Sequence, residues 1–293
     1  MFNSFKGVFE MAKADGYEVI TAKIVELLEQ GVIPWEKPFF GTGMAQNFNT
    51  KKPYRGVNSF LLSTMANVFG WSNKWLTFNQ IKNRGGKVVK GSKSTPVIFF
   101  KFIDVEDKDT GEEKRIALVK NYNVFNLSQT EGIDFDIEDP EPREFTPIEA
   151  AEQIVANMPN APVTEWGKGK AAYSPSKDVV IMPSKGDFVG NEELYSTWFH
   201  ELVHSTGHES RLDREELTTF CGFGSHSYSK EELTAEMGAA FLCGVAGIAN
   251  KTIENSAAYI QSWLKVLKND PKFVVSAASK AQKAADYIQG ITY

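Results

Sequence analysis

Apolar residues in the first half of this 293-residue chain recur at helical spacing. They predict a helix over residues 16–30, with Gly31 behind it in a C-cap position. The stretch VNSFLLSTMANVFG predicts a second helix. A short third helix is expected in LTFNQIKNRGG, because Thr77 and Gln80 have the spacing of a capping box.

Two apolar stretches rich in β-branched and aromatic residues, STPVIFFKFIDV and RIALVKNYNVF, flank the turn-like DKDTGEEK and predict a β-hairpin. The second half is mainly helical in pattern. A helix near 147–157 precedes a strand within 173–182, and EELYSTWFHELVHSTG predicts a helix between Asn191 and Gly207. Three more helices are expected, in SKEELTAEMGAAFLCGV, NSAAYIQSWLKVLKN and KFVVSAASKAQKAADYIQG. The sequence therefore predicts an α+β protein whose second half has a small β-sheet.

The charges divide the chain into two parts. Residues 1–130 carry 18 basic and 12 acidic side chains, whereas the rest carries 14 and 25. No acidic residue occurs between Lys37 and Ile103, where eleven lysines and arginines are found. Residues 131–147, EGIDFDIEDPEPREFTP, combine acids with three prolines and predict an interdomain linker. We therefore expect one domain over 1–130 and another over 148–293.

Composition narrows the class of protein. The N-terminus lacks the basic and apolar segments of a secretory signal. The longest nearly apolar run, MGAAFLCGVAGIA, is shorter than the roughly 20 residues that span a bilayer. Two cysteines, Cys221 and Cys243, are too few for a framework of disulfides. These features predict a cytoplasmic protein that does not bind membranes.

Three of the four histidines lie in the stretch WFHELVHSTGHESRL. His200 and His204 are four residues apart, so they project from the same face of the predicted helix. HELVH fits the pattern H-E-x-x-H, in which two imidazoles bind zinc and the glutamate accepts a proton from the attacking water. The pattern predicts a zinc site for peptide-bond hydrolysis, with Glu201 as the general base.

The third metal ligand has to come from elsewhere in the chain. The metzincin pattern requires a histidine where this sequence has Ser210. KEELTAEMGAAFL instead provides Glu232 and Glu236, one helical turn apart, as in the gluzincin pattern. Glu232 is then the expected ligand and Glu236 the expected hydrogen-bond partner of a ligand histidine. Glu231, Glu236 and Asp213 remain competing ligands.

Other residues near the motif have both functional and structural interpretations. His208 lies behind the expected helix end, where it is more suited to bonding that end than to binding metal. His226 and Tyr228 could donate hydrogen bonds to a tetrahedral oxyanion, or they could be structural. The strand within 173–182 could pair with an extended peptide substrate, or could only form part of the sheet.

The basic window is also rich in aromatic residues. Positive charge along a phosphate backbone and rings that stack on unpaired bases are the two components of single-strand binding. A solvated basic face that balances the acidic half is the alternative. NTKKPYRGVN and NRGGKVVKGSK combine glycine turns with basic side chains, and no sequence-reading motif is evident. The candidate DNA contacts are Lys51, Lys52, Tyr54, Arg55, Arg84, Lys87, Lys90 and Lys93.

Motifs from both halves also resemble a known family. GVIPWEKPF, NTKKPYRGVNSFLL, WLTFNQIKNRGGKVVKGSK, YNVFNLSQTEGI, MPSKGDF, HELVHSTGHESRLDR and YSKEELTAEMGAAFL resemble the ArdC antirestriction proteins of plasmids, phages and integrative elements. The resemblance covers nearly the whole chain in the same order. It implies an N-terminal single-stranded-DNA-binding domain followed by a zincin-like metallopeptidase domain.

The resemblance also implies a biological role, the protection of incoming mobile DNA from host restriction. By the same resemblance, His200 and His204 match the family's histidines, Glu201 the glutamate between them and Glu232 the downstream acid. The chain is similar as well to the DNA-binding part of certain plasmid primases, although it has no primase catalytic motif.

Two other functions remain open from the sequence. The protein could be a DNA-binding module whose metal only holds helices together. It could also be a cytosolic regulatory metallopeptidase that cleaves a repressor or a DNA-bound protein, with the basic half recognising protein. A catalytic zinc keeps an open coordination position, whereas a structural zinc is closed by four protein ligands.

Overall fold

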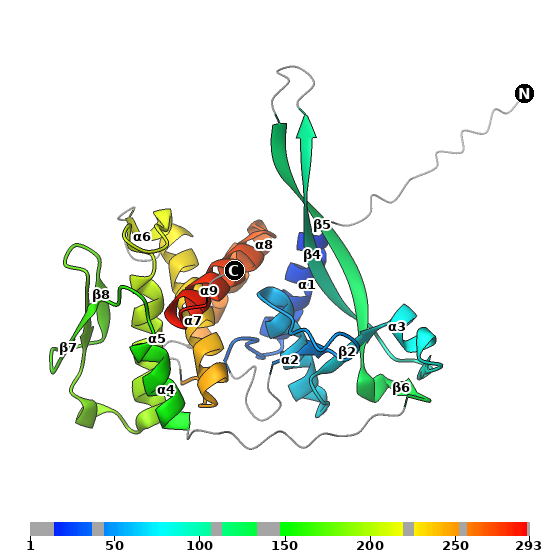
Figure 1. Ribbon diagram of the computed structural model, residues 1–293, viewed down its shortest axis with the longest axis horizontal. Helices are drawn as coiled ribbons and strands as arrows, with labels where there is room; N and C mark the ends of the chain where they lie inside the picture. Colours follow the sequence, from blue (N-terminus) through cyan, green and yellow to red (C-terminus); the bar gives the residue numbers. More distant parts are fainter. Residues whose placement is uncertain are drawn as a thin grey trace, which may run out of the picture.

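The computed structural model describes residues 15–36, 44–106, 113–133, 147–218, 226–251 and 257–291, with only the backbone given in parts of some helices and strands. The first half is built around a long β-hairpin, as the two stretches rich in β-branched and aromatic residues predicted. The hairpin strands β4 and β5 extend beyond the rest of the molecule (Figure 1). The elements of this half are α1 (Gly16–Glu29), β1 (Gln46–Asn47), α2 (Val57–Phe69), β2 (Lys74–Thr77), α3 (Phe78–Asn83), β3 (Lys87–Val88), β4 (Thr95–Glu106), β5 (Glu113–Asn126), a 3-10 turn (Leu127–Gln129) and β6 (Thr130–Glu131).

The hairpin belongs to a four-stranded sheet with the order β1-β2-β5-β4. β4 and β5 pair antiparallel from Thr95 opposite Val124 to Glu106 opposite Glu113. β2 continues the sheet antiparallel to β5, and β1 pairs parallel to β2. Helix α1 covers one face of the hairpin, where a Cβ on Gly16 would lie 2.9 Å from a methyl group of Val119. The opposite face carries the buried Val97 and Val124, beneath α2.

The second half is mainly helical with a small sheet, which confirms the predicted fold class. The elements of the second half are α4 (Pro147–Ala156), β7 (Val163–Trp166), β8 (Ala172–Ser174), β9 (Val179–Met182), a 3-10 turn (Lys185–Asp187), α5 (Asn191–Ser205), α6 (Glu215–Thr218), α7 (His226–Ala246), α8 (Ala257–Asn269) and α9 (Phe273–Ile288). The small sheet has the order β7-β9-β8, with β7 parallel and β8 antiparallel to β9.

Helices α5 and α7 pack unusually closely. A Cβ on Gly238 of α7 would lie 2.6 Å from a methyl group of Val203 on α5, which is closer than real atoms approach. Because glycine has no side chain, the two backbones can come together at this point. Both helices are buried along most of their length, and this contact sets the distance between the residues that they carry.

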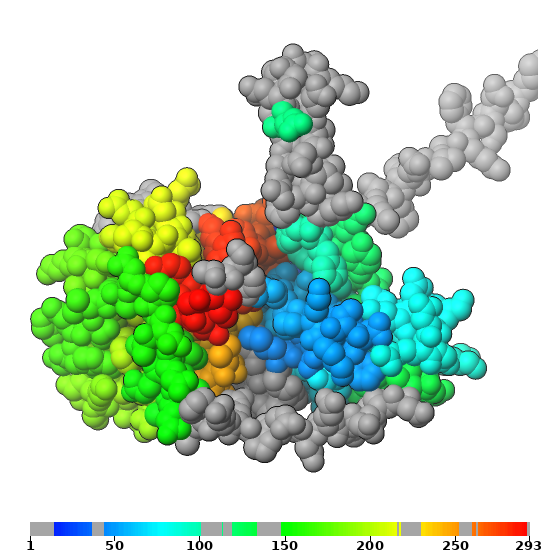
Figure 2. Space-filling model, viewed as in Figure 1, coloured from blue at the N-terminus to red at the C-terminus, as the bar shows by residue number. Residues whose placement is uncertain are grey.

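One hydrophobic core extends through both halves of the chain. Ile24 of α1 and Phe60 of α2 belong to the same buried cluster as Phe199 of α5, Phe241 of α7 and Phe273 of α9. The rings of Phe60 and Phe241 have centroids 4.4 Å apart. In Figures 1 and 2, α9 lies between the first half and the helices of the second half, and the two halves form a continuous body.

Polar contacts tie the halves together as well. Thr21 Oγ1 donates to the carbonyl oxygen of Pro271 at 2.6 Å, and Asn250 Nδ2 donates to that of Trp35 at 3.2 Å. Arg55 forms an ion pair with Asp286 of α9. Each contact joins residues more than 200 positions apart, so the two charge-defined parts of the sequence are integrated in the fold.

The predicted long helices and the long hairpin are confirmed with small shifts at their ends. The single strand predicted within 173–182 was wrong, because this segment forms two antiparallel strands, β8 and β9, joined by a turn. Thr77 and Gln80 form the expected capping box. Helix α5 begins at Asn191 itself, with Gly190 as N-cap, and ends at Ser205 with Thr206 as C-cap, directly before the expected Gly207. A Cβ at Gly207 would lie 3.0 Å from the guanidinium of Arg214, so a larger residue there would crowd this side chain.

The short strands β1, β2, β3, β6 and β7 and the four-residue helix α6 were not predicted, because elements of two to four residues leave little periodic signal. Residues 134–146 of the expected linker lie outside the described residues, whereas Glu131 belongs to β6 and Pro147 to α4. No helix among the described residues combines the length and the apolar character that a membrane crossing requires.

The shared core makes a prediction about unfolding. Phe60→Ala removes a fully buried ring and should lower the free energy of unfolding by about 3–5 kcal/mol. Calorimetry of the variant should show a single unfolding transition, shifted as a whole to a lower temperature. Phe78→Ala is the matched control, because Phe78 is 56% exposed. Two transitions, of which only one moved, would contradict a shared core.

Candidate metal centre

The two motif histidines and the downstream glutamate lie together between α5 and α7. His200 and His204 project from the same face of α5, with their Nε2 atoms 3.1 Å apart. Glu232, in the second turn of α7, faces both of them. One carboxylate oxygen is 3.7 Å from His200 Nε2 and the other is 3.6 Å from His204 Nε2.

These donors suit a divalent metal ion. One donor atom from each of His200, His204 and Glu232 lies within 4.8 Å of the others. Imidazole nitrogens together with a carboxylate oxygen are a typical ligand set for zinc and similar transition metals. The structure thus brings together the three ligands expected from the sequence. Asp213, one of the competing ligands, is exposed in the turn behind α5 and is outside this group.

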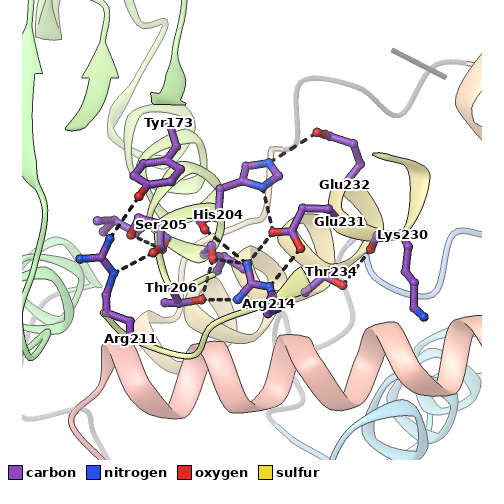
Figure 3. A network of polar contacts seen from close by, with 12 residues as sticks. Tyr173, His204, Ser205, Thr206, Arg211, Arg214, Lys230, Glu231, Glu232 and Thr234 are labelled. Atoms are coloured by element: carbon purple, nitrogen blue, oxygen red, sulfur yellow. Dashed lines mark hydrogen bonds and ion pairs between the residues drawn. The ribbon is translucent and has the colours of Figure 1, made fainter. Parts of the chain in front are cut away.

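Glu231 has a different position from Glu232, although the two residues are neighbours. Its Oε1 lies 3.2 Å from Nδ1 of His204 (Figure 3). A proton on Nδ1 that is donated to this carboxylate leaves Nε2 as the free metal donor, so Glu231 fixes both the ring orientation and the tautomer. The sequence indicated Glu231 only as a competing ligand.

Glu231 is itself held by Arg214, a residue that the sequence did not single out. Arg214 Nε donates to Glu231 Oε2 at 3.0 Å, and its Nη2 binds Oε1 (Figure 3). Both side chains are buried, with exposed fractions of 5% and 6%. Burial raises the pKa of the Glu231 carboxyl, but the contacts with His204 and Arg214 outweigh it and lower the pKa.

Arg214 also binds the end of helix α5. Its Nη2 donates to the carbonyl oxygen of Val203 at 2.8 Å, and its Nη1 donates to the hydroxyl of Thr206. The last carbonyls of a helix have no partner within the helix and carry partial negative charge. One guanidinium therefore stabilises this helix end and connects it to the carboxylate on α7.

Glu236 lies beside the other histidine. Its Oε1 is 3.6 Å from Nδ1 of His200, which is an ion-pair distance and longer than the hydrogen bond expected from the sequence. Burial lowers the pKa of His200, but Glu232, Glu236 and Glu201 outweigh burial and raise the pKa to about 10. Without a metal ion the site therefore favours a protonated imidazole, and metal binding has to displace that proton.

The other residues that the sequence singled out near the motif differ in burial and in their contacts. Glu201 is buried beside the histidines, with 7% exposure. The His208 side chain accepts a hydrogen bond from the backbone N–H of Ser210 at 3.2 Å, within the loop behind α5. The backbone N–H of His208 donates to the carbonyl oxygen of Ser205 at the end of the helix. His226 and Tyr228 belong to the first turn of α7, but their side chains lie outside the described residues.

A second charged network links the small sheet to the loop behind α5. Arg211 forms an ion pair with Asp178, and Tyr173 donates to the same carboxylate at 2.8 Å. Arg211 Nε donates to the carbonyl oxygen of Ser205 at 2.7 Å (Figure 3). Hydrogen bonding from Arg211 is the main cause of a lowered Asp178 pKa. This network holds the β8–β9 turn against the end of the metal-site helix.

Most of the predicted DNA contacts are exposed basic residues in two loops. The loops meet at Phe48, since Lys51 Nζ is 4.8 Å and the Arg84 guanidinium carbon 5.0 Å from its ring centroid. The exposed members of the set are Lys51, Lys52, Arg55, Arg84, Lys87, Lys90 and Lys93.

Tyr54 and Arg55 of the predicted set contact residues that are distant along the chain. Tyr54 is only 7% exposed and packs in a cluster with Trp75 and Val97, so it does not offer a free stacking face. Arg55 is paired with Asp286. The sequence could not indicate these contacts, because the partners are distant along the chain.

Comparisons with known proteins find relatives of both halves of the chain. Residues 149–280 match a family described as a zincin-like metallopeptidase, and residues 14–125 match the N-terminal domain of anti-restriction factor ArdC. The fold is similar to the metal-free crystal structure of the antirestriction ArdC protein from plasmid R388, with a TM-score of 0.74, 34% identity and coverage of 97% of this chain and 100% of that one. The chain belongs to the ArdC family.

The Mn(II)-bound structure of the same R388 protein is also similar to this ArdC-family chain, with a TM-score of 0.75, 34% identity and coverage of 94% and 98% of the two chains. A divalent ion thus fits the family as well as the donors found here. An uncharacterized protein of Sinorhizobium fredii, y4eC, is 32% identical over 286 residues, which cover 94% of this chain and 91% of y4eC.

A DNA primase of Escherichia coli, TraC, contains a region similar to this ArdC-family chain. It is 32% identical over 93% of the chain, in two forms of TraC. The chain spans only 20% and 27% of the length of those proteins. The similarity therefore covers both halves of this chain and a minor part of TraC.

Arg214 should control metal affinity through Glu231 and His204. Arg214→Met should weaken metal binding by about 10- to 100-fold, as loss of outer hydrogen bonds does at other metal sites. Competition with a chelator, well below the melting temperature, measures the affinity. Lys251→Met is the matched control, because Lys251 pairs with Glu192 at the surface. A folded Arg214→Met protein with wild-type affinity would contradict this role.

The Asp178–Arg211 pair predicts a pH dependence. Because the folded-state pKa of Asp178 lies below its ordinary value of 3.8, the pair stabilises the fold above that value and loses this effect as pH falls through the lowered pKa. Asp178→Asn should lower the melting temperature at neutral pH, and the difference should shrink below about pH 4. Asparagine tolerates the positive φ of 49° at this position. A difference that stayed constant with pH would exclude the ionic contribution.

Proposed function

We propose that this ArdC-family chain is an antirestriction protein of a mobile genetic element, which binds single-stranded DNA and cleaves protein through a zinc site at His200, His204 and Glu232. The observation that carries the proposal is the convergence of these three donors beside the buried Glu201. A catalytic zinc site has three protein ligands and an open position, and within the described part of the chain the donor group has three members.

A zinc ion held by these residues supplies a Lewis acid that polarises a carbonyl group and acidifies water. The chain's own residues provide the rest. Glu231 and Glu236 orient the two imidazoles, and Glu201 is the group that accepts a proton and returns it to the leaving amine. Burial keeps bulk water away from this carboxylate.

An extended peptide has a place to bind next to this site. β8 lies at the edge of the small sheet, and both β8 and β9 pack on the metal-site helix α5. An edge strand offers unpaired backbone groups to which a peptide can add as a further strand. The edge strand β8, within the segment for which a single strand was predicted, thus supports a peptide substrate in the proposal.

The first half supports DNA binding by its charge. Its exposed lysines and arginines lie in a window without acidic residues, which favours a polyanion. The R388 protein is described as an antirestriction protein, and this chain is similar to it over nearly its whole length. Together these facts support action of the peptidase half on proteins at DNA.

Two alternatives remain, each with its own discriminating feature. A purely structural metal would need a fourth protein ligand. A peptidase whose basic half recognises protein would lack the steep salt dependence that phosphate contacts cause.

Glu201→Gln separates these possibilities. The variant should retain metal and DNA binding, because Glu201 belongs to neither the ligand group nor the basic half, and should lose any peptidase activity. We would measure binding of labelled single-stranded and duplex oligonucleotides at two salt concentrations, metal content, and cleavage of an unstructured protein by mass spectrometry.

The wild type should prefer the single strand, lose affinity steeply with salt and carry about one zinc ion per chain. Equal affinity for duplex and single strand would overturn the DNA part of the proposal. Cleavage that persisted in Glu201→Gln, or was absent from the zinc-loaded wild type, would overturn the peptidase part.

A further inference from the structure

An exposed pair of aromatic rings lies on the sheet of the first half, outside the loops described above. Phe99 of β4 and Tyr122 of β5 are 47% and 46% exposed. Their ring centroids are 5.5 Å apart with an interplanar angle of 74°. Tyr54 lies behind them, 6.4 Å from the Phe99 ring, so the pair is the outer part of a row of three rings.

The rings are held on a rigid base. Val97 pairs with Tyr122, and Phe99 pairs with Lys120. Because side chains alternate along a strand, Phe99 lies on the same face as Val97, and Tyr122 on the same face as Val124. Both valines are buried in the cluster beneath α2. On this face the two exposed rings are therefore direct neighbours of packed core residues. The backbone that carries the rings is already ordered before a ligand binds.

The surroundings of the rings are positive. Lys120 is directly opposite Phe99 in the β-ladder and is exposed. Neither residues 95–103 nor residues 114–126 include an acidic residue. Flat exposed rings beside positive charge suit a ligand that has both an aromatic face and an anionic backbone. Unpaired bases of a nucleic acid strand have these properties, whereas a base pair inside a duplex has no free face.

We propose that Phe99 and Tyr122 form a stacking platform for a single DNA strand, in which each of the two nearly perpendicular rings takes an unpaired base, with Lys120 beside the phosphates. The inference deepens the proposed function, because it rests on DNA binding by this half and assigns the site of base contact. The basic loops around Phe48 then guide the backbone, and the Phe99–Tyr122 platform provides the preference for single strands.

The neighbouring ring Phe100 provides a matched control. It is 43% exposed on the same strand, but successive side chains point to opposite faces, and its ring lies 6.1 Å from Tyr17 of α1. Phe99→Ala and Phe100→Ala therefore remove the same side chain, at similar exposure, from opposite sides of one sheet.

The test is binding of a labelled oligothymidylate and of an abasic oligonucleotide of equal length, measured by fluorescence anisotropy. Phe99→Ala and Tyr122→Ala should each weaken binding of the oligothymidylate by roughly 5- to 150-fold, the effect of losing one stacked base. Phe100→Ala, and Tyr122→Phe, which keeps the ring, should bind like the wild type. The abasic strand should bind weakly to every variant, and Phe99→Ala should not weaken it further.

Charge is tested separately from stacking. Lys120→Gln should reduce the slope of log affinity against log salt by about 0.7, the contribution of one phosphate contact in a single strand. Melting temperatures of all variants show whether each is folded.

The outcomes distinguish this inference from the proposed function. If the wild type binds no oligonucleotide, the platform and the DNA part of the proposed function are both overturned. If the wild type binds but Phe99→Ala and Tyr122→Ala bind equally well, or Phe100→Ala loses as much as Phe99→Ala, only the platform is overturned. A change in the sedimentation mass of Phe99→Ala relative to the wild type would instead identify the rings as a contact between copies of the chain, and would also overturn it.

Discussion

The close packing of α5 against α7 at Gly238 is the constraint on which the metal centre depends. The two histidines come from one helix and the third donor from the other, so the distance between the backbones decides whether the three donors converge. Any side chain at Gly238 would meet Val203 and force the helices apart. Convergence of Glu232 with His200 and His204 thus follows from a packing contact that includes no ligand.

The charges around the centre follow from the same packing. Bringing α7 against α5 buries Glu231 and Glu236 beside the histidines, and a buried carboxylate is costly unless it is paired. Arg214 provides the pairing for Glu231 and also binds the end of α5. Part of the favourable energy of the Arg214–Glu231 contacts is therefore needed to offset the cost of removing these charges from water. The main effect of the contacts on the site is to fix the orientation of His204.

Local spacing was sufficient to predict the helices, the long hairpin and the pairing of His200 with His204 on one face. It was less informative where the outcome depends on distant residues. Glu231 and Glu232 are adjacent and chemically identical, and which of them faces both histidines depends on how α7 is rotated against α5. The partner that pairs with Glu231, Arg214, lies 17 residues earlier. The side chain of Tyr54 is buried by α2 and the sheet, and Arg55 is paired with a residue 231 positions away. Composition around these residues carries no information about such partners.

The core that joins α1 and α2 to the second half limits how the gene can be divided. A break near residue 140 would leave both fragments with uncovered apolar helices, so neither would be expected to fold well without the other. Recombination that transfers this coding sequence should therefore preserve a folded product only when it transfers both halves. The TraC relatives fit this restriction, because they retain the counterpart of nearly the whole chain inside a much longer protein.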